Sequence, residues 1–385
     1  MQIHDVVHGA ENARRVEALD LLRMVAVIGV IAYHFGFNGP TSNGTHHIAL
    51  PDIGEVAKYG YLGVQLFFVI SGFAIAFTAD GRSASDFVIA RVSRIYPAFL
   101  FCMSVTFVLT VAFGAPEFQS NLHQWAANLI IAAPALKQPY VDSVYWTIML
   151  ELTFYAWVYL LMLSGLFQRH LCVTVLVWIA LSMVNEAFIG SHVVRKLLLT
   201  DQSGFFASGL LLYELYAGRQ RAAVQWTLAF AAICAVLSAV RNVAWFREHL
   251  GGDYNNWVVA AISLGAIIVT MLGMRIRRIP LPPYLIVAIG GLTYPLYLLH
   301  QQIGYLVFLR LKELVGHPAV LVGAIVSLMV TLSWATWKYV DRPGQRLARR
   351  GLQKLTRRPE SKTRSPASDT ADATVGALTL RPLQA

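Results

Sequence analysis

The chain of 385 residues is 56% hydrophobic and only 14% charged, whereas soluble globular proteins carry about 25% charged residues. This composition excludes an ordinary soluble domain and predicts a protein embedded in a bilayer. The net charge of +10 does not indicate nucleic-acid binding, because eleven of the 31 basic residues lie from Lys338 onward, beside the last apolar run. Such a cluster is typical of a segment that flanks the inner leaflet of a membrane.

Ten apolar runs follow one another along the chain, and most approach the roughly 20 residues that a helix needs to cross a bilayer. The sixth run is the shortest. We therefore predict an all-α fold, a polytopic integral membrane protein with about ten transmembrane helices. The predicted spans are 19–37, 60–79, 95–114, 143–166, 171–189, 203–217, 223–240, 256–274, 290–309 and 318–339.

Lysine and arginine residues predict the orientation, because short cytoplasmic loops carry more of them than external loops do. Arg14 and Arg15 precede the first span, and the segment after the last span is basic. An even number of spans then places both termini in the cytoplasm. We expect a cytoplasmic segment at 1–18, a membrane domain at 19–345 and a basic, disordered cytoplasmic tail at 346–385. The first run lacks a small-residue cleavage site, so we expect no cleavable signal peptide.

The three cysteines, Cys102, Cys172 and Cys234, all lie inside apolar runs. Their spacing fits neither a disulfide framework nor a metal site. We interpret them as small buried apolar side chains, and we expect no metal and no tightly bound cofactor.

The first span contains the stretch "RMVAVIGVIAYH", which begins at Arg23 and ends at His34. Ionisable residues inside a membrane segment are costly, so each is a candidate for function. At about 100° per residue, the spacing brings both side chains to one face of an α-helix, about 16 Å apart along its axis. A snorkelling arginine and an interfacial histidine would also fit this pattern.

The motif "RVSRIYPAF" leads into the third span and carries Arg91 and Arg94 on one helical face, ahead of Pro97. Two guanidinium groups at the inner surface suit a ligand that bears phosphate groups. Anchoring of the span by its positive charge is the alternative interpretation.

The fourth span, "YWTIMLELTFYAWVY", places Glu151 about two turns in from its outer end. A carboxylate at that depth is expected to face the protein interior and to have a partner. His34 enters the membrane from the same end, so we hypothesise a His34–Glu151 pair that orients the imidazole and raises its basicity. A protonated glutamate with a purely structural role is the alternative.

Further polar and aromatic side chains lie in the second, fourth and ninth spans. The ninth, "GGLTYPLYLLHQQIGYLVF", also contains Pro295, which is expected to bend the helix. These groups would line a pocket, bind an acceptor or serve packing. The candidates for pocket lining are Gln65, Ser71, Trp146, Tyr155, Tyr294, Tyr297 and His300.

Six motifs in chain order, from about 14 to 345, resemble those of the integral-membrane acyltransferases of acyltransferase family 3. In the first, Arg23 and His34 have the family's spacing, and one departure is that many members carry aspartate where this chain has Gln65. We therefore do not assign to Gln65 the role that the aspartate carboxylate has in those members. The six are "RVEALDLLRMVAVIGVIAYH", "GYLGVQLFFVISGF", "RVSRIYPAF", "YWTIMLELTFY", "GGLTYPLYLLHQ" and "YVDRPGQR".

The resemblance implies transfer of an acyl group, commonly acetyl, from cytoplasmic acetyl-CoA to a sugar hydroxyl of a cell-envelope polysaccharide or its lipid-linked precursor. Arg91 and Arg94 would bind the phosphates of CoA, with Arg23 deeper along its pantetheine arm. His34 would do the chemistry, as general base or as acyl-histidine nucleophile, and Glu151 would hold it. The resemblance also implies a multi-pass protein of the cytoplasmic (inner) membrane. Succinyl or a longer acyl group stays open.

Two functions without catalysis fit some of the same features. A transporter or flippase of a glycan or of an acyl-carrying intermediate would also place polar residues in its spans. A scaffold subunit of an envelope-polymer complex would need none of them. For an acyltransferase we expect acyl-CoA, a sugar acceptor and the lipid bilayer as partners, and the sequence does not indicate an oligomeric state.

Overall fold

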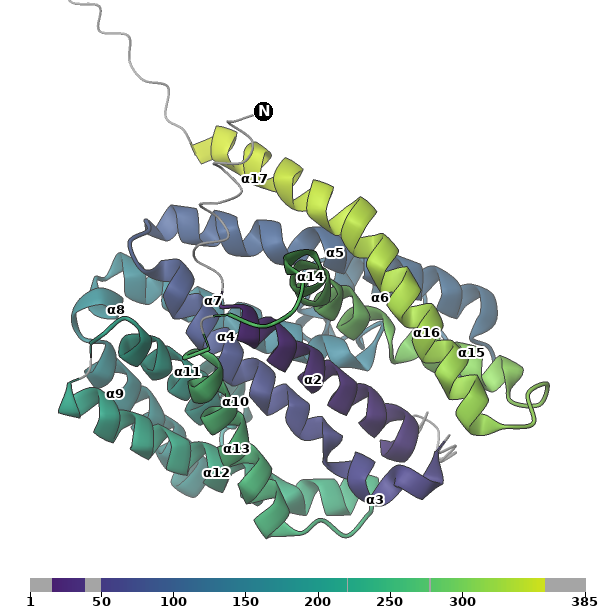
Figure 1. Cartoon of the computed structure of the whole chain (residues 1–385), viewed down its shortest axis with the longest axis horizontal. Helices are drawn as coiled ribbons and strands as arrows, with labels where there is room; N and C mark the ends of the chain where they lie inside the picture. The colour runs from purple at the N-terminus through teal and green to yellow at the C-terminus, as the bar shows by residue number, and fades with distance from the viewer. Residues whose placement is uncertain (1–15, 39–49, 220, 277, 357–385) are drawn as a thin grey trace, which may run out of the picture.

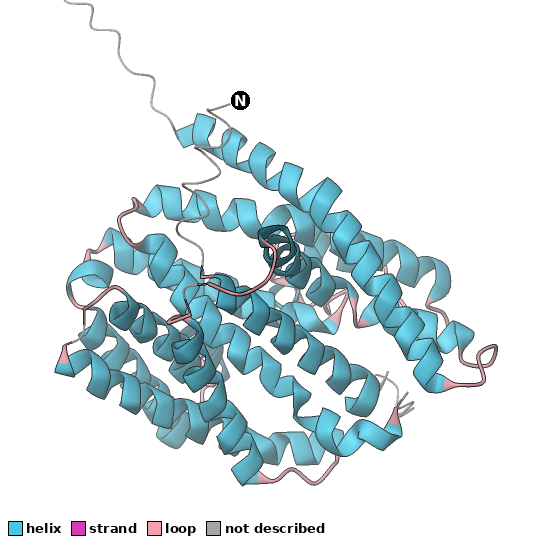
Figure 2. Ribbon diagram, viewed as in Figure 1, coloured by secondary structure: helices cyan, strands magenta, loops and turns pink. Residues whose placement is uncertain are grey.

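The computed structural model describes residues 16–38, 50–219, 221–276 and 278–356, and over these ranges it is built of helices without strands (Figure 2). Eight helical segments are long and apolar enough to cross a membrane. The prediction of an all-α polytopic membrane protein is confirmed. The eight segments are Glu17–Asn38, Gly54–Ala79, Ala84–Phe113, Ser143–Leu163, Leu171–Ile189, Ala222–Leu250, Asn256–Gly273 and Pro318–Thr356.

Short π-helical and 3₁₀-helical turns adjoin several of the long helices within these segments. Shorter helices connect the segments. The α-helices outside the sixth and ninth predicted spans are α2 (Glu17–Tyr33), α3 (Gly54–Ala57), α4 (Gly63–Ala79), α5 (Ala84–Phe113), α6 (Leu122–Asn128), α7 (Trp146–Leu163), α8 (Leu166–Arg169), α9 (Leu171–Val184), α10 (His192–Leu198), α12 (Ala222–Leu250), α13 (Asn256–Gly273), α16 (Pro318–Thr336) and α17 (Arg342–Thr356).

The ninth predicted span is broken into α14 (Pro283–Leu299) and α15 (Gln302–Leu311), which are bent by 64°. If the pair crosses as one span, it is the ninth candidate in the described part of the chain. The helix runs through Pro295 without interruption, so the break lies about five residues later than the predicted bend. This shift places His300 at the break.

The sixth predicted span forms α11 (Ser203–Tyr216), which at 14 residues is too short to cross a bilayer alone. The predicted number of about ten long spans is corrected accordingly. The hydroxyl of Tyr213 donates to Asp80, directly after α4, so α11 runs parallel to α4 and both end on the same side. Protein surrounds α11 from Ser203 to Tyr213, and a helix buried in this way need not match the bilayer thickness.

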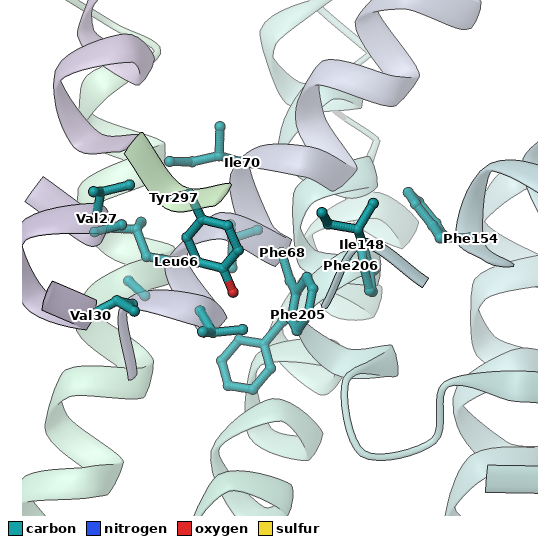
Figure 3. Close-up of a cluster of buried hydrophobic side chains, with 14 of the residues drawn as sticks. Val27, Val30, Leu66, Phe68, Ile70, Ile148, Phe154, Phe205, Phe206 and Tyr297 are labelled. Carbon is teal, nitrogen blue, oxygen red and sulfur yellow. The ribbon is translucent and has the colours of Figure 1, made fainter. Parts of the chain in front are cut away.

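Glycines let α4 and α11 approach each other closely. A Cβ atom on Gly209 would lie 2.1 Å from the carbonyl oxygen of Val69, and one on Gly72 would lie 2.2 Å from the carbonyl oxygen of Phe206. Small residues at such contacts let helix backbones pack directly in membranes. Large aromatic and aliphatic side chains of α4, α7 and α11 fill the space beside this contact (Figure 3).

α2 lies in the middle of the bundle, where it contacts α4, α13 and α14 (Figure 1). α5 and α17 pack together on one flank, and α9 and α12 on the other (Figure 1). The central position of α2 means that side chains along it face several other helices. A site built around this helix can therefore combine groups from distant parts of the sequence.

The last helix corrects one sequence prediction. α17 continues to Thr356, so residues 346–356 of the expected disordered tail are helical. The helix packs along α5, where Gly344 lies against Pro97. Residues 1–15 of the predicted N-terminal segment and 357–385 of the predicted tail lie outside the described residues.

Candidate active site

A cavity of about 160 Å³ lies between α2, α4, α5, α7 and α14. Eight of the twelve residues predicted from the sequence line it, and they come from all five helices. Four others, His34, Gln65, Trp146 and His300, lie outside its lining. The eight lining residues are Arg23, Ser71, Arg91, Arg94, Glu151, Tyr155, Tyr294 and Tyr297.

Two of the three arginines that line the cavity are paired with buried carboxylates. Arg94 lies 3.1 Å from Asp341, whose side chain is 1% exposed, and Arg23 lies 3.1 Å from Asp20 one turn earlier on α2. The ring of Tyr294 also faces Arg94, with 5.6 Å between the guanidinium carbon and the ring centroid. These pairs hold the guanidinium groups in place and offset part of their charge.

Arg91 has contacts of a different kind. It donates to the hydroxyl of Thr78 at 2.7 Å, and its guanidinium carbon lies 5.8 Å from the ring centroid of Tyr155. Its Nε atom is buried and has no hydrogen-bond partner in the described part of the chain. A buried charged donor without a partner is costly, so Arg91 is the group of this cavity best placed to receive a polar or anionic ligand.

Glu151 faces the cavity between Ser71 and Tyr155. The Ser71 hydroxyl donates to Oε1 at 3.0 Å, and the Tyr155 hydroxyl donates to the same oxygen. The predicted His34–Glu151 pair is therefore wrong. Tyr155 is one turn further along α7 and Ser71 lies in the middle of α4, so the carboxylate is held in the cavity lining by groups from two helices.

His34 instead belongs to a group at the break between α14 and α15. Its Nδ1 atom lies 3.0 Å from the hydroxyl of Tyr305, and the same hydroxyl donates to the carbonyl oxygen of His34 at 3.2 Å. The ring centroids of His34 and His300 are 5.2 Å apart. Both histidines are buried, with exposed fractions of 8% and 1%.

Arg23 and His34 lie eleven residues, about three turns, apart along α2. The backbone of His34 is still α-helical, since its N–H bonds to the carbonyl oxygens of Val30 and Ile31, and a π-helical turn follows from His34 to Asn38. The two side chains therefore leave the helix at different depths, Arg23 at the cavity and His34 beside Tyr305.

Tyr297 lies between the cavity and the two histidines. Its ring lines the cavity, its hydroxyl is 2.9 Å from that of Thr147, and its ring centroid is 5.7 Å from that of His300. In Figure 3 its side chain lies among apolar residues, including Leu66 and Ile70. Tyr297 thus contacts both the cavity, with its charged lining, and His300.

The loop before α7 fixes the break that carries His300. Asp142 accepts a hydrogen bond from the backbone N–H of Gln302 at 3.0 Å and another from that of Val144 at 3.1 Å. Burial raises the pKa of Asp142 to about 7. One carboxylate thereby joins the start of α15 to the segment that enters α7.

Besides His300, two predicted lining residues lie outside the cavity lining. Trp146, the first residue of α7, is 42% exposed. Gln65 is buried, but the lining comes from its neighbours Val64 and Phe67. The Oε1 atom of Gln65 has no hydrogen-bond partner among the described residues.

Sequence reasoning missed Tyr305, Thr147 and Asp341. Tyr305 lies in the quoted ninth span, and its only signal was a phenol inside an apolar run. Thr147 carried no signal beyond its proximity to Glu151. Asp341 is buried and lies within the quoted "YVDRPGQR" motif, but its pairing with Arg94 depends on how α17 packs along α5.

A family model described as "Acyltransferase domain" matches residues 16–338. The chain belongs to this acyltransferase family. The matched range contains the cavity and the histidine group of this acyltransferase, and with the apolar helices it identifies a multi-pass membrane protein. No solved structure matches the chain.

Two curated relatives of this acyltransferase are similar to it over part of the chain. The "Peptidoglycan O-acetyltransferase OatA" of Listeria monocytogenes is 35% identical over 118 residues, which are 29% of this chain and 16% of that protein. The "Putative peptidoglycan O-acetyltransferase YrhL" of Bacillus subtilis is 32% identical over 113 residues, which are 28% of this chain and 15% of that protein. The matched region therefore spans about a sixth of each relative.

Proposed function

We propose that this acyltransferase moves an acyl group, in particular acetyl, from acyl-CoA to a sugar hydroxyl of a cell-surface polysaccharide or its lipid-linked precursor. Family membership supports acyl transfer, and the names of the two relatives support O-acetylation of a cell-wall glycan. The observation that carries the proposal is the buried, unpartnered Nε atom of Arg91 in a cavity lined by three arginines.

The donor fits the arrangement of charges around the cavity. The phosphates of CoA would bind at Arg91 and Arg94, because guanidinium groups match phosphate oxygens in geometry and charge. A cavity of about 160 Å³ admits only part of a CoA molecule. That part would be the uncharged pantetheine arm with its thioester, since Glu151 would repel a phosphate at the centre of the cavity.

The acyl transfer itself would take place at His34. The thioester would pass Tyr297, whose side chain must move aside, because it lies between the cavity and the histidines. His34 would remove the proton of the acceptor hydroxyl as general base. Attack by the imidazole itself, to give an acyl-histidine, is the other route. Incubation with labelled acetyl-CoA in the absence of acceptor distinguishes the two, because only the second route leaves a labelled acetyl group on His34.

The acceptor and the orientation complete the proposal. Donor binding at the arginines assigns that side of the protein to the cytoplasm, in agreement with the basic segments at both ends of the sequence. The acceptor would meet the histidine group from the opposite side. The protein would then act in the cytoplasmic membrane on a glycan of the cell envelope.

The test uses the full chain purified in detergent. Free thiol released from acetyl-CoA is measured with and without glycan fragments, and we expect release that depends on the acceptor. His34→Ala should reduce it to a small residual rate, whereas His317→Ala, an exposed histidine before α16, should not. Acceptor-dependent release at the wild-type rate in His34→Ala would refute the role of His34. Glycan counter-flow without consumption of acetyl-CoA would identify a transporter instead.

A further inference from the structure

The hydrogen bonds of His300 determine where its proton lies. Its Nδ1 atom is 2.8 Å from the carbonyl oxygen of Tyr297, and a carbonyl oxygen can only accept. The neutral ring therefore carries its proton on Nδ1, and Nε2 has a free lone pair. This Nε2 atom is buried and has no hydrogen-bond partner in the described part of the chain. Buried acceptors without a partner are rare in native proteins, so we expect Nε2 to receive a hydrogen bond during the reaction.

The same reasoning applies to His34. The Tyr305 hydroxyl has one proton and contacts both the carbonyl oxygen and the Nδ1 atom of His34. Both hydrogen bonds form together only if the hydroxyl donates to the carbonyl and Nδ1–H donates to the hydroxyl oxygen. His34 then also has its free lone pair on Nε2.

Two neighbouring imidazoles with free Nε2 lone pairs cannot bond to each other. Their ring centroids are 5.2 Å apart, and His300 Nε2 has no hydrogen-bond partner among the described residues, so the two rings are neighbours that are not bonded in this state. Addition of a single proton changes this, because Nε2–H of one ring can then donate to Nε2 of the other. The pair of His34 and His300 is thus built to accept one proton.

We propose that His300 is a positioning residue that shares the proton His34 removes from the acceptor hydroxyl, the role that the sequence suggested for Glu151. This inference rests on the proposed function. The hydroxyl oxygen forms a bond to the acyl carbon while its proton moves to Nε2 of His34. The carbon–sulfur bond breaks, and the thiolate leaves. His300 accepts a hydrogen bond from the His34 imidazolium until that proton passes to the sulfur, which yields the ester and free CoA thiol.

Two substitutions of His300 test this role by separating size from hydrogen bonding. His300→Leu removes the acceptor nitrogen, whereas His300→Gln keeps an acceptor oxygen. We expect His300→Leu to lower kcat for thiol release by about 10- to 100-fold, as for loss of a hydrogen bond to a charged group, with KM for acetyl-CoA unchanged. His300→Gln should recover part of kcat. The control is His317→Leu, the same replacement at an exposed position.

A double-mutant cycle shows whether His300 acts through His34. Residual release in His34→Ala should not fall further when His300→Leu is added, because the two residues work as a unit. An equal loss in both backgrounds, or a raised KM with unchanged kcat, would overturn the inference. If His300→Leu unfolds in detergent, the cycle is run with His300→Phe, which also lacks the acceptor nitrogen. An inactive wild type refutes the proposed function, whereas an active wild type with a fully active His300→Leu refutes only the role of His300.

Discussion

Arg91 and Arg94 are three residues apart on α5, yet the structure predicts different consequences when each is replaced by glutamine. Arg91 contacts the uncharged Thr78 hydroxyl and the Tyr155 ring, so its charge stays available for a ligand. Arg94 is paired with the buried Asp341. We expect Arg91→Gln to weaken donor binding and Arg94→Gln to weaken the fold.

The magnitudes follow from these contacts. Loss of a charge-assisted hydrogen bond costs about 1.5–3 kcal/mol, which corresponds to about a 10- to 150-fold rise in KM for Arg91→Gln. Arg94→Gln leaves the Asp341 carboxylate buried without its cation, for which about 3–5 kcal/mol of unfolding free energy is typical. The Arg94 side chain is 38% exposed, so solvent screening reduces this loss to about 1–2 kcal/mol.

The assay measures thiol release against acetyl-CoA concentration for both variants, together with thermal unfolding in detergent. Arg169→Gln, an exposed arginine at the end of α8, is the control for loss of one positive charge. We expect Arg91→Gln to raise KM more than Arg94→Gln does, because Arg94 shares its charge with Asp341, and only Arg94→Gln to lower the unfolding temperature clearly. A wild-type KM in Arg91→Gln would refute the assignment of the donor phosphates to this side chain.

Three further predictions concern the histidine group, the helix contact and the loop carboxylate. Tyr305→Phe removes the hydroxyl that holds the His34 ring, so kcat for thiol release should fall about tenfold at constant KM; an unchanged kcat would contradict this role. Gly209→Ala forces a methyl group against the backbone of α4 and should cost about 1–3 kcal/mol in thermal unfolding, whereas Gly265→Ala meets open space on α13 and should be neutral. Burial raises the pKa of Asp142 to about 7, above its value in the unfolded chain. The free energy of unfolding is therefore highest below about pH 4 and falls by up to about 4 kcal/mol as the pH rises toward 7. A difference in unfolding free energy between wild type and Asp142→Asn that stays constant from pH 4 to 8 would contradict this.

The sequence was informative wherever the free energy of placing a residue type in the membrane does not depend on the packing around it. Apolar runs predicted the long helices, because a bilayer rewards them regardless of how they pack. Charged residues inside those runs pointed to Arg23 and Glu151, because such charges are costly in any fold. Both line the same cavity. The extent of α11 was predicted to within one residue, but its burial was not, since an apolar run does not reveal whether lipid or protein surrounds it.

The partners of these side chains could not be predicted in the same way. The expected contact of His34 with Glu151 rested on their entry into the membrane from the same end. The His34 ring instead lies beside Tyr305 of α15, and the start of α15 is bonded to a carboxylate from a distant loop, Asp142. Such arrangements arise from tertiary contacts, and helical periodicity carries no information about them.

The separation of Glu151 from His34 suits the proposed chemistry better than the expected pair. A carboxylate beside His34 would favour its charged form before the substrate arrives, and a protonated imidazole cannot act as base. A neutral, buried imidazole beside a second neutral imidazole is ready to take a proton and has a neighbour to share it. The positive charge of Arg91 is kept at the cavity, where an anionic donor requires it. Tyr297 between the cavity and the histidines lets one protein bind a phosphate-bearing donor and still keep its base uncharged.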